Sequence, residues 1–70
     1  MDRDLDLAIT YLIVDGLFGP FTVEEWASSS EVSPSFNSRE EAITLVDAHA
    51  DEINPEDEGL LREIYGRFPI

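Results

Sequence analysis

The chain has 70 residues, of which 16 are acidic and four are basic, so its formal net charge is −12 at pH 7. All four bases are Arg, and the sequence contains neither Lys nor Cys. A chain of this length forms one domain, and without Cys it holds no disulfide and none of the usual zinc sites. The negative field disfavours nucleic acid and anionic membranes as direct partners and favours a basic protein surface.

The hydrophobic share of 43% indicates a chain that folds, because disordered chains have low hydrophobicity. The longest apolar stretch, residues 7–14, is interrupted by Thr10 and preceded by acidic residues. A secretory signal begins with basic residues, and a membrane span needs about 20 apolar residues. We therefore expect a cytoplasmic protein that forms a single domain over residues 1–70.

Residues 5–18 carry apolar side chains at spacings of three and four, which predicts a helix with one buried face. These side chains belong to Leu5, Ala8, Ile9, Leu12, Ile13, Leu17 and Phe18. The alternative is an α+β fold with a strand over residues 7–14, because this segment is rich in β-branched residues and Asp15-Gly16 suits a hairpin turn. We favour the helix because no second alternating run is available to pair with a strand.

A short second helix is predicted to begin at Thr22. Thr22 and Glu25 have the spacing of a capping box, while Phe21 and Trp26 have that of a hydrophobic staple. The three consecutive Ser residues at 28–30 weaken the helix, so residues 28–37 are expected to form a loop.

A third helix is predicted after a second capping box formed by Ser38 and Glu41. Its apolar side is expected to include Ala42, Ile43, Val46, His49, Ala50 and Ile53.

The last helix is predicted to begin with Asn54 as cap and Pro55 at the first helical position. An apolar stripe of Leu60, Leu61, Ile64, Tyr65 and Phe68 follows, and Pro69 is expected to end the helix. Two acid-first pairs, Glu58 with Arg62 and Glu63 with Arg67, would each add about 0.2–0.5 kcal/mol. Together these patterns predict an all-α fold, a small compact bundle of about four helices of which one is short.

The sequence offers little for catalysis. His49 is the only histidine, and its place near the apolar side of the third helix favours a structural role. Asp47 and Asp51 have a spacing that would let them share a cation, although such pairs are common on solvated helices. The chain contains neither a Gly-x-Ser-x-Gly elbow nor a Gly-rich phosphate loop. We therefore expect a non-enzymatic protein without a metal or cofactor.

The segment Pro20–Ala27 resembles the first helix of helix-turn-helix domains, which would place residues 38–50 in the recognition position. The resemblance implies a transcription-associated domain. However, the expected recognition helix carries Glu40, Glu41 and Asp47 against Arg39, and DNA phosphates would repel it. In this interpretation the domain is degenerate, and it has lost DNA binding but kept a protein-interaction role.

The acidic residues of the third and fourth helices are the candidate binding face. On one continuous helix, Glu40 and Asp47 would lie about 10 Å apart along the axis, and Asp47 and Asp51 about 6 Å apart. A rigid array of carboxylates would enter a cleft that binds phosphates and inhibit a nucleic-acid-binding protein by imitating its substrate. The full candidate face comprises Glu40, Glu41, Asp47, Asp51, Glu52, Glu56 and Asp57.

Phe21–Trp26 followed by residues 38–41 resembles the first two helices of the small acidic immunity proteins of nuclease toxins. The resemblance implies an inhibitor, in the broad manner of phage-encoded inhibitors of host defence, although the spacing and the C-terminal half depart from that family. Affinity also needs an apolar or aromatic anchor, for which the candidates are Trp26, Phe36 and Tyr65.

Two further interpretations compete with an acidic inhibitor. The chain would instead be a small assembly subunit or a homodimer that buries the surplus apolar surface of residues 5–18. Alternatively, the acidity would reflect adaptation to a salty cytoplasm, as in halophiles, with a solvated acidic face of no further meaning.

Overall fold

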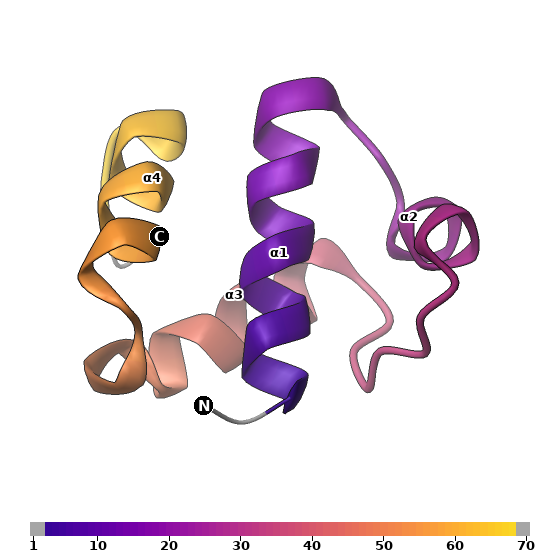
Figure 1. The fold of residues 1–70 in the computed structure, drawn as a ribbon, viewed down its shortest axis with the longest axis horizontal. Coiled ribbons are helices and arrows are strands. Elements are labelled where there is room, and N and C mark those ends of the chain that lie inside the picture. Colours follow the sequence, from indigo (N-terminus) through magenta and orange to yellow (C-terminus); the bar gives the residue numbers. More distant parts are fainter. Residues whose placement is uncertain (1–2, 69–70) are drawn as a thin grey trace.

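The computed structural model describes residues 3–68 and contains four α-helices with one short 3-10 turn. The elements are α1 (Arg3–Phe18), α2 (Val23–Ser30), α3 (Arg39–Ala48), the 3-10 turn η1 (Ala50–Glu52) and α4 (Pro55–Tyr65). No strand occurs among these residues, so the all-α prediction is confirmed and the alternative strand over residues 7–14 is wrong. Figure 1 shows α1 at the centre, flanked by α4 on one side and α2 on the other, with α3 behind it.

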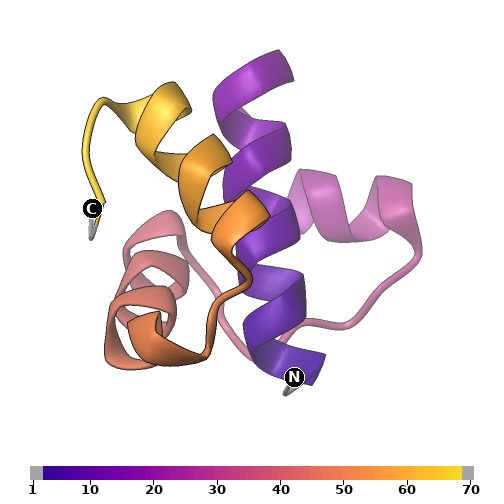
Figure 2. The ribbon, with the colours of Figure 1, turned by 60° about the vertical axis from the view of Figure 1, so that its left-hand side comes forward.

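The centre of the core is the inner face of α1. Its buried residues recur at spacings of three and four, so they form one stripe along the helix. They are Leu5, Ala8, Ile9, Tyr11, Leu12 and Asp15. Full burial of one large side chain such as Leu or Ile contributes about 1.5–3 kcal/mol, so this stripe contributes substantially to the stability of the fold. α3 and α4 pack against it, and Figure 2 shows α4 running alongside α1 in the same general direction.

Three aromatic rings hold α2 and the loop after it against α1. The ring of Tyr11 lies 5.3 Å from that of Trp26 and 5.9 Å from that of Phe36, measured between centroids. Trp26 and Phe36 stack on each other at 6.2 Å. Such pairs add about 0.5–1.5 kcal/mol beyond the area they bury, which explains how so short a helix stays docked.

The beginning of α2 confirms the predicted capping box. The Glu25 amide donates to the Thr22 hydroxyl at 3.1 Å, and the Thr22 amide donates to the Glu25 carboxylate at 3.1 Å. Contrary to the prediction of a loop from residue 28, the helix continues to Ser30.

The end of α2 is a left-handed residue that is not glycine. Glu31 has φ 56°, and its amide donates to the Ser28 carbonyl at 3.3 Å. The Val32 amide donates to the Ala27 carbonyl at 3.0 Å. This is the pattern of a Schellman motif, in which glycine is the usual residue at the left-handed position.

The second capping box forms only in part. The Glu41 amide donates to the Ser38 hydroxyl at 3.2 Å, as predicted. The Glu41 carboxylate instead accepts from the amide of Asn37, at 2.7 Å, one residue before the expected partner. The Glu41 side chain therefore holds the last residue of the loop before the cap, and it does not bond to the amide of the cap residue Ser38.

α3 ends at Ala48, five residues short of Ile53, where the predicted apolar side ended. His49 caps it: the Nδ1–H tautomer donates to the Leu45 carbonyl at 3.0 Å, and the His49 amide donates to Val46 at 3.2 Å. The chain then tightens into η1, which still delivers Ile53 to the core. The predicted structural role of His49 is thus a helix cap.

α4 begins as predicted, because the Asn54 side chain accepts from the Glu56 amide at 2.9 Å and Pro55 is the first helical residue. It ends at Tyr65, earlier than predicted, because Gly66 adopts a left-handed φ of 77°. Phe68 lies beyond the helix, and the expected stop at Pro69 lies outside the described residues.

One of the two predicted ion pairs of α4 is present. The Arg62 guanidinium lies 2.8 Å from the Glu58 carboxylate. The pair of Glu63 with Arg67 is not found among residues 3–68, because Arg67 follows the end of the helix.

Candidate interaction surface

The seven acidic residues of the predicted face are spread over three consecutive elements. Six are exposed and Asp57 is half-buried. Because α3 ends at Ala48, Asp51 does not follow Asp47 on the same helix, and the predicted helical row through Glu40, Asp47 and Asp51 is wrong. The residues are Glu40 and Glu41 in the first turn of α3, Asp47 in its last turn, Asp51 and Glu52 in η1, and Glu56 and Asp57 in the first turn of α4.

Five of these acids follow one another around the corner between α3 and α4, and we call them the acidic corner: Asp47, Asp51, Glu52, Glu56 and Asp57. Within residues 3–68, one ion-pair contact involves these acids: His49 Nε2 lies 4.0 Å from the Glu52 carboxylate, and it is charged only when the ring is protonated. The guanidinium groups of Arg39 and Arg62 are paired with other carboxylates. The corner therefore keeps most of its negative charge. No group of three or more potential metal ligands is assembled in this described part of the chain.

Two of the three predicted anchors are unavailable to a partner. Trp26 is 5% exposed and Phe36 is 4% exposed, because both rings stack into the cluster around Tyr11. As candidate anchors, both residues are buried in the fold itself, and Phe36 is a loop residue folded back over the core. Tyr65 is half-buried, and its hydroxyl donates to the Leu12 carbonyl at 2.5 Å, so its polar end already has a partner.

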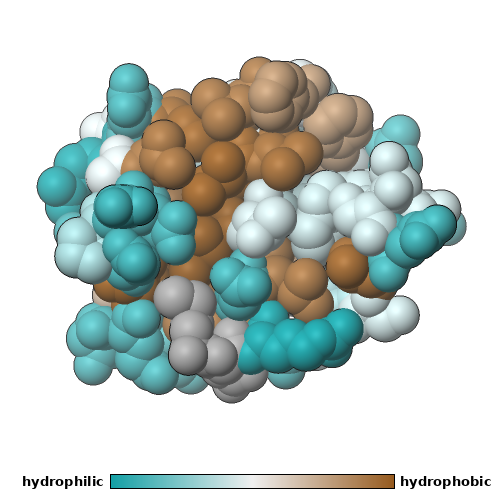
Figure 3. All heavy atoms as spheres, viewed as in Figure 1, coloured by the Kyte–Doolittle hydropathy of each residue, from teal (hydrophilic) through white to brown (hydrophobic). Residues whose placement is uncertain are grey.

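The two most exposed large apolar residues of the described chain lie elsewhere, at the end of α1. Leu60 on α4, expected on an apolar stripe, is also exposed, at 40%. Leu17 is 55% exposed and Phe18 is 73% exposed, and the half-buried Ile13 and Val14 lie one turn earlier on the same side. We call these four residues the α1 apolar surface. Figure 3 shows hydrophobic side chains gathered over this part of the molecule. The sequence prediction put Leu17 and Phe18 on the buried face. At this end of α1, however, apolar residues occur on more than one side of the helix, and the neighbouring helices cover only one of those sides.

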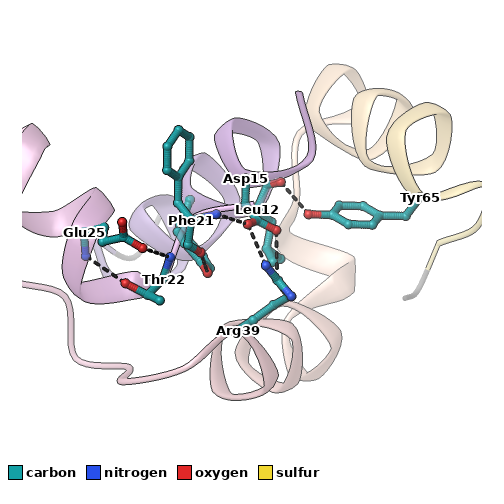
Figure 4. A network of polar contacts seen from close by, with 8 residues as sticks. Leu12, Asp15, Phe21, Thr22, Glu25, Arg39 and Tyr65 are labelled. Atoms are coloured by element: carbon teal, nitrogen blue, oxygen red, sulfur yellow. Dashed lines mark hydrogen bonds and ion pairs between the residues drawn. The ribbon is translucent and has the colours of Figure 1, made fainter. Parts of the chain in front are cut away.

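The buried polar centre of the molecule is an ion pair that the sequence prediction missed. Asp15 is 7% exposed. Its carboxylate accepts from Arg39 Nε at 2.8 Å, from Arg39 Nη2 at 2.7 Å and from the Phe21 amide at 2.9 Å. Figure 4 shows the Arg39 side chain rising from α3 to meet Asp15 on α1. One signal was available, since Asp15 follows Leu12 by three residues and Tyr11 by four, on the buried stripe.

These contacts decide the ionisation of the groups around Asp15. Burial alone would raise the pKa of Asp15, but the hydrogen bonds from Arg39 and Phe21 and the charge of Arg39 together hold this pKa below its ordinary value. Burial, aided by the Asp15 charge, raises the pKa of Tyr65 to about 12. Asp15 therefore stays ionised and Tyr65 stays neutral near pH 7.

The same network fixes the connection between α1 and α2. The Tyr11 hydroxyl donates to the Phe21 carbonyl at 2.7 Å, while the Phe21 amide donates to Asp15. Both backbone groups of Phe21 are thereby satisfied, and no buried side-chain polar atom in the described chain lacks a partner. A cavity of about 470 Å³ opens beside Tyr11, Phe21 and Arg39. The polar groups of Tyr11, Phe21 and Arg39 beside it are already engaged in hydrogen bonds within the fold.

A smaller cavity of about 310 Å³ lies between α1 and α2. Val14, Phe21 and Trp26 form its apolar wall, and Glu25, Ser29 and Ser30 form its polar wall. Val14 belongs both to this wall and to the α1 apolar surface, so the two features are continuous.

The chain matches no protein-family model, no curated protein and no solved structure. Among the described helices, none is by itself both long and apolar enough to cross a membrane, and α1 and α2 satisfy that test only as a pair bent by 104°. Function must therefore be argued from the geometry of the surface.

Proposed function

We propose that this protein is a non-enzymatic binding protein whose acidic corner meets a basic surface on a partner protein. The observation that supports the proposal is the exposure of Asp47, Asp51, Glu52 and Glu56. Among residues 3–68, their one ion-pair contact is that of Glu52 with His49, which is charged only when protonated. Charge of one sign on such a surface accelerates association with an oppositely charged partner and suppresses association with like-charged ones.

The single histidine and the buried carboxylate, which are the candidates for acid–base catalysis, have structural roles instead. His49 caps α3 through its Nδ1, and Asp15 is held by two hydrogen bonds from Arg39. This supports binding rather than catalysis as the function.

The finer form of the proposal concerns the partner's own ligand. A protein surface that binds nucleic acid uses Lys and Arg to neutralise phosphates. Carboxylates spread over α3, η1 and α4 would occupy that surface in place of phosphates, so the protein would act as an inhibitor in nucleic-acid-mimic style.

The test is affinity capture from host lysate with tagged protein, eluted by a rising salt gradient and repeated with two variants. The first variant, Asp47→Asn/Asp51→Asn/Glu52→Gln, removes charge from the acidic corner. The matched control, Asp6→Asn/Glu24→Gln/Glu63→Gln, removes the same charge from exposed positions on other helices.

We expect a basic, nucleic-acid-handling protein that leaves as salt rises, that the first variant fails to retain and that the control retains. Equal losses in both variants would mean that only the overall charge matters. Partners that hold through high salt in all three proteins would contradict the proposal, because screening weakens surface electrostatic contacts.

A further inference from the structure

The last two turns of α1 carry apolar side chains that the rest of the described chain leaves uncovered. Leu17 and Phe18 expose 55% and 73% of their surface, and Ile13 and Val14 extend the patch toward the core. A contiguous exposed apolar patch on a small protein is typical of a binding site. The protein has a net charge of −12, and charges at the rim of an interface mainly raise the association rate. The apolar patch can supply the buried contacts on which the affinity for a partner depends.

The cavity between α1 and α2 gives this patch a shape. Its apolar lining is formed by Val14, Phe21 and Trp26, and its volume is about 310 Å³. Ligand pockets begin at about this size, and it would admit one large apolar side chain. A partner lying across Leu17 and Phe18 could therefore place one such side chain beside Trp26.

One acidic side chain, that of Glu25, lines the cavity, together with the neutral hydroxyls of Ser29 and Ser30 in the last turn of α2. Neither α1 nor α2 carries a basic residue in its last turn, so the carbonyl ends of both helices keep their partial negative charge. A partner that fits these groups carries cations beside its apolar residues.

We propose that the α1 apolar surface and this cavity bind an amphipathic helix with basic residues on its polar side, contributed by the partner protein. The proposal rests on the proposed function, since it specifies what the basic partner presents. An amphipathic helix supplies anchors at helical spacing for an elongated apolar patch and cations for its rim. A second copy of this chain complements the surface less well, because its net charge of −12 repels and its helices present acidic polar sides.

The probe is a synthetic helical peptide of about 14 residues, roughly four turns, with Leu on one face and Lys on the other. A peptide with the same Leu positions and Glu in place of Lys is the charge control. Binding is followed by the fluorescence of Trp26, the only Trp of the chain, and mapped by amide chemical shifts in NMR.

The test variant is Leu17→Ser/Phe18→Ser, which removes only exposed side chains, with Phe18→Ser as the milder form if the double variant folds poorly. The control is Leu45→Ser, which removes an apolar side chain from a separate groove beside Phe36 and Thr44. We expect the Lys peptide to shift the Trp26 emission, the double variant to weaken binding about tenfold or more, and the control to stay within about twofold.

Several results would overturn this assignment while leaving the proposed function standing. One such result is that the double variant binds the Lys peptide as tightly as the wild type, whereas the Asp47→Asn/Asp51→Asn/Glu52→Gln variant does not bind it. The amide chemical shifts would then map the peptide to the acidic corner. Equal binding of the Glu peptide would remove the charge argument. A dimer in sedimentation that the double variant converts to monomer would make a second copy the occupant. Binding of the Lys peptide that does not weaken as salt rises would likewise remove the charge argument. The proposed function is tested separately, by whether the capture experiment yields a salt-sensitive partner that the acidic-corner variant fails to retain.

Discussion

The guanidinium of Arg39 on α3 donates two hydrogen bonds, of 2.7 and 2.8 Å, to the carboxylate of Asp15 on α1, which lies 24 residues earlier in the sequence. The two ends of this pair differ in environment: the Asp15 side chain is 6% exposed and the Arg39 side chain 41%. Removing Arg39 therefore leaves a buried carboxylate without its cationic partner, whereas removing Asp15 leaves a guanidinium that water can reach. The pair also joins α3 to the α1–α2 connection through Phe21.

Replacing Arg39 tests how much this pair stabilises the fold. We expect Arg39→Met to lower the free energy of unfolding by about 2–4 kcal/mol, below the usual cost of breaking a fully buried pair because Arg39 is partly open to solvent. Arg39→Lys should lower it by about 1–2 kcal/mol, since the charge remains but the two-pronged geometry is lost. Urea unfolding measures both, and a loss below about 0.5 kcal/mol for Arg39→Met would contradict a structural role for the pair.

The ionisation of Asp15 makes part of the stability depend on pH. Its pKa lies below the ordinary value of 3.8, so the contribution is fully present above that value and is lost as pH falls through the folded-state pKa. Protonation of the surface acids relieves repulsion and acts in the opposite direction, so the wild type is best compared with Asp15→Asn. We expect the stability gap between the two proteins to be wide at pH 7 and to shrink below about pH 3.8. A gap that stays constant would show that Asp15 has the same pKa in the folded and unfolded chain.

Local signals in the sequence were enough to place the beginnings of the helices. A cap depends on residues within three or four positions of one another, so Thr22 and Asn54 reveal their helices without any tertiary information. The end of α3 could not be predicted this way. A continued helix would also have kept Ile53 on the apolar side, so the apolar spacing does not distinguish it from the observed end at Ala48 with His49 as cap.

The surface was harder to predict than the fold. Phe36 sits among polar residues in sequence, yet it is buried, because the rings of Tyr11 and Trp26 draw the loop inward. Leu17 and Phe18 fit the buried spacing but are exposed, because periodicity gives the faces of a helix and not how far its neighbours extend. The pairing of Asp15 with Arg39 spans two helices whose contact the sequence alone does not specify.

Gly16 on α1 lies against Ile64 and Tyr65 of α4, so adding a methyl group there should be harmful. An Ala side chain would overlap Ile64 Cγ2 and come within 3.3 Å of the Tyr65 hydroxyl. Helix propensity favours Ala by about 1 kcal/mol, but overpacking costs about 1–3 kcal/mol, and we expect a net loss of stability. Gly59→Ala is the matched control, because nothing lies within 4 Å of its added carbon, and it should gain about 0.5–1 kcal/mol. If thermal unfolding shows that both changes stabilise equally, the two helices are not closely packed at Gly16.

Glu31 holds the left-handed position at the end of α2 at a cost that glycine would avoid. A residue with a Cβ loses about 1–2 kcal/mol there, part of which the entropy of glycine in the unfolded chain cancels. Glu31→Gly should therefore raise the free energy of unfolding by about 0.5–1 kcal/mol. At Gly66, which has φ 77°, the opposite kind of change, Gly66→Ala, should lower the free energy of unfolding by a similar amount. No gain in Glu31→Gly, measured by urea unfolding, would show that the Glu side chain makes a compensating contact.

The hydroxyl of Tyr65 should make the fold sensitive to alkali. Folding raises the pKa of this phenol from 10.0 to about 12, so its contribution is complete below pH 10 and is lost as pH rises from 10 to about 12. Tyr65→Phe removes the hydrogen bond to Leu12 and should cost about 0.5–1.5 kcal/mol at neutral pH. Because it has no proton to lose, this variant should approach the stability of the wild type above pH 10. Tyr11 remains in both proteins, and burial raises its pKa as well, so the difference in phenolate absorbance between the two proteins reports Tyr65. An unchanged stability gap across this range, or a difference in absorbance that rises near pH 10, would contradict the bond between Tyr65 and α1.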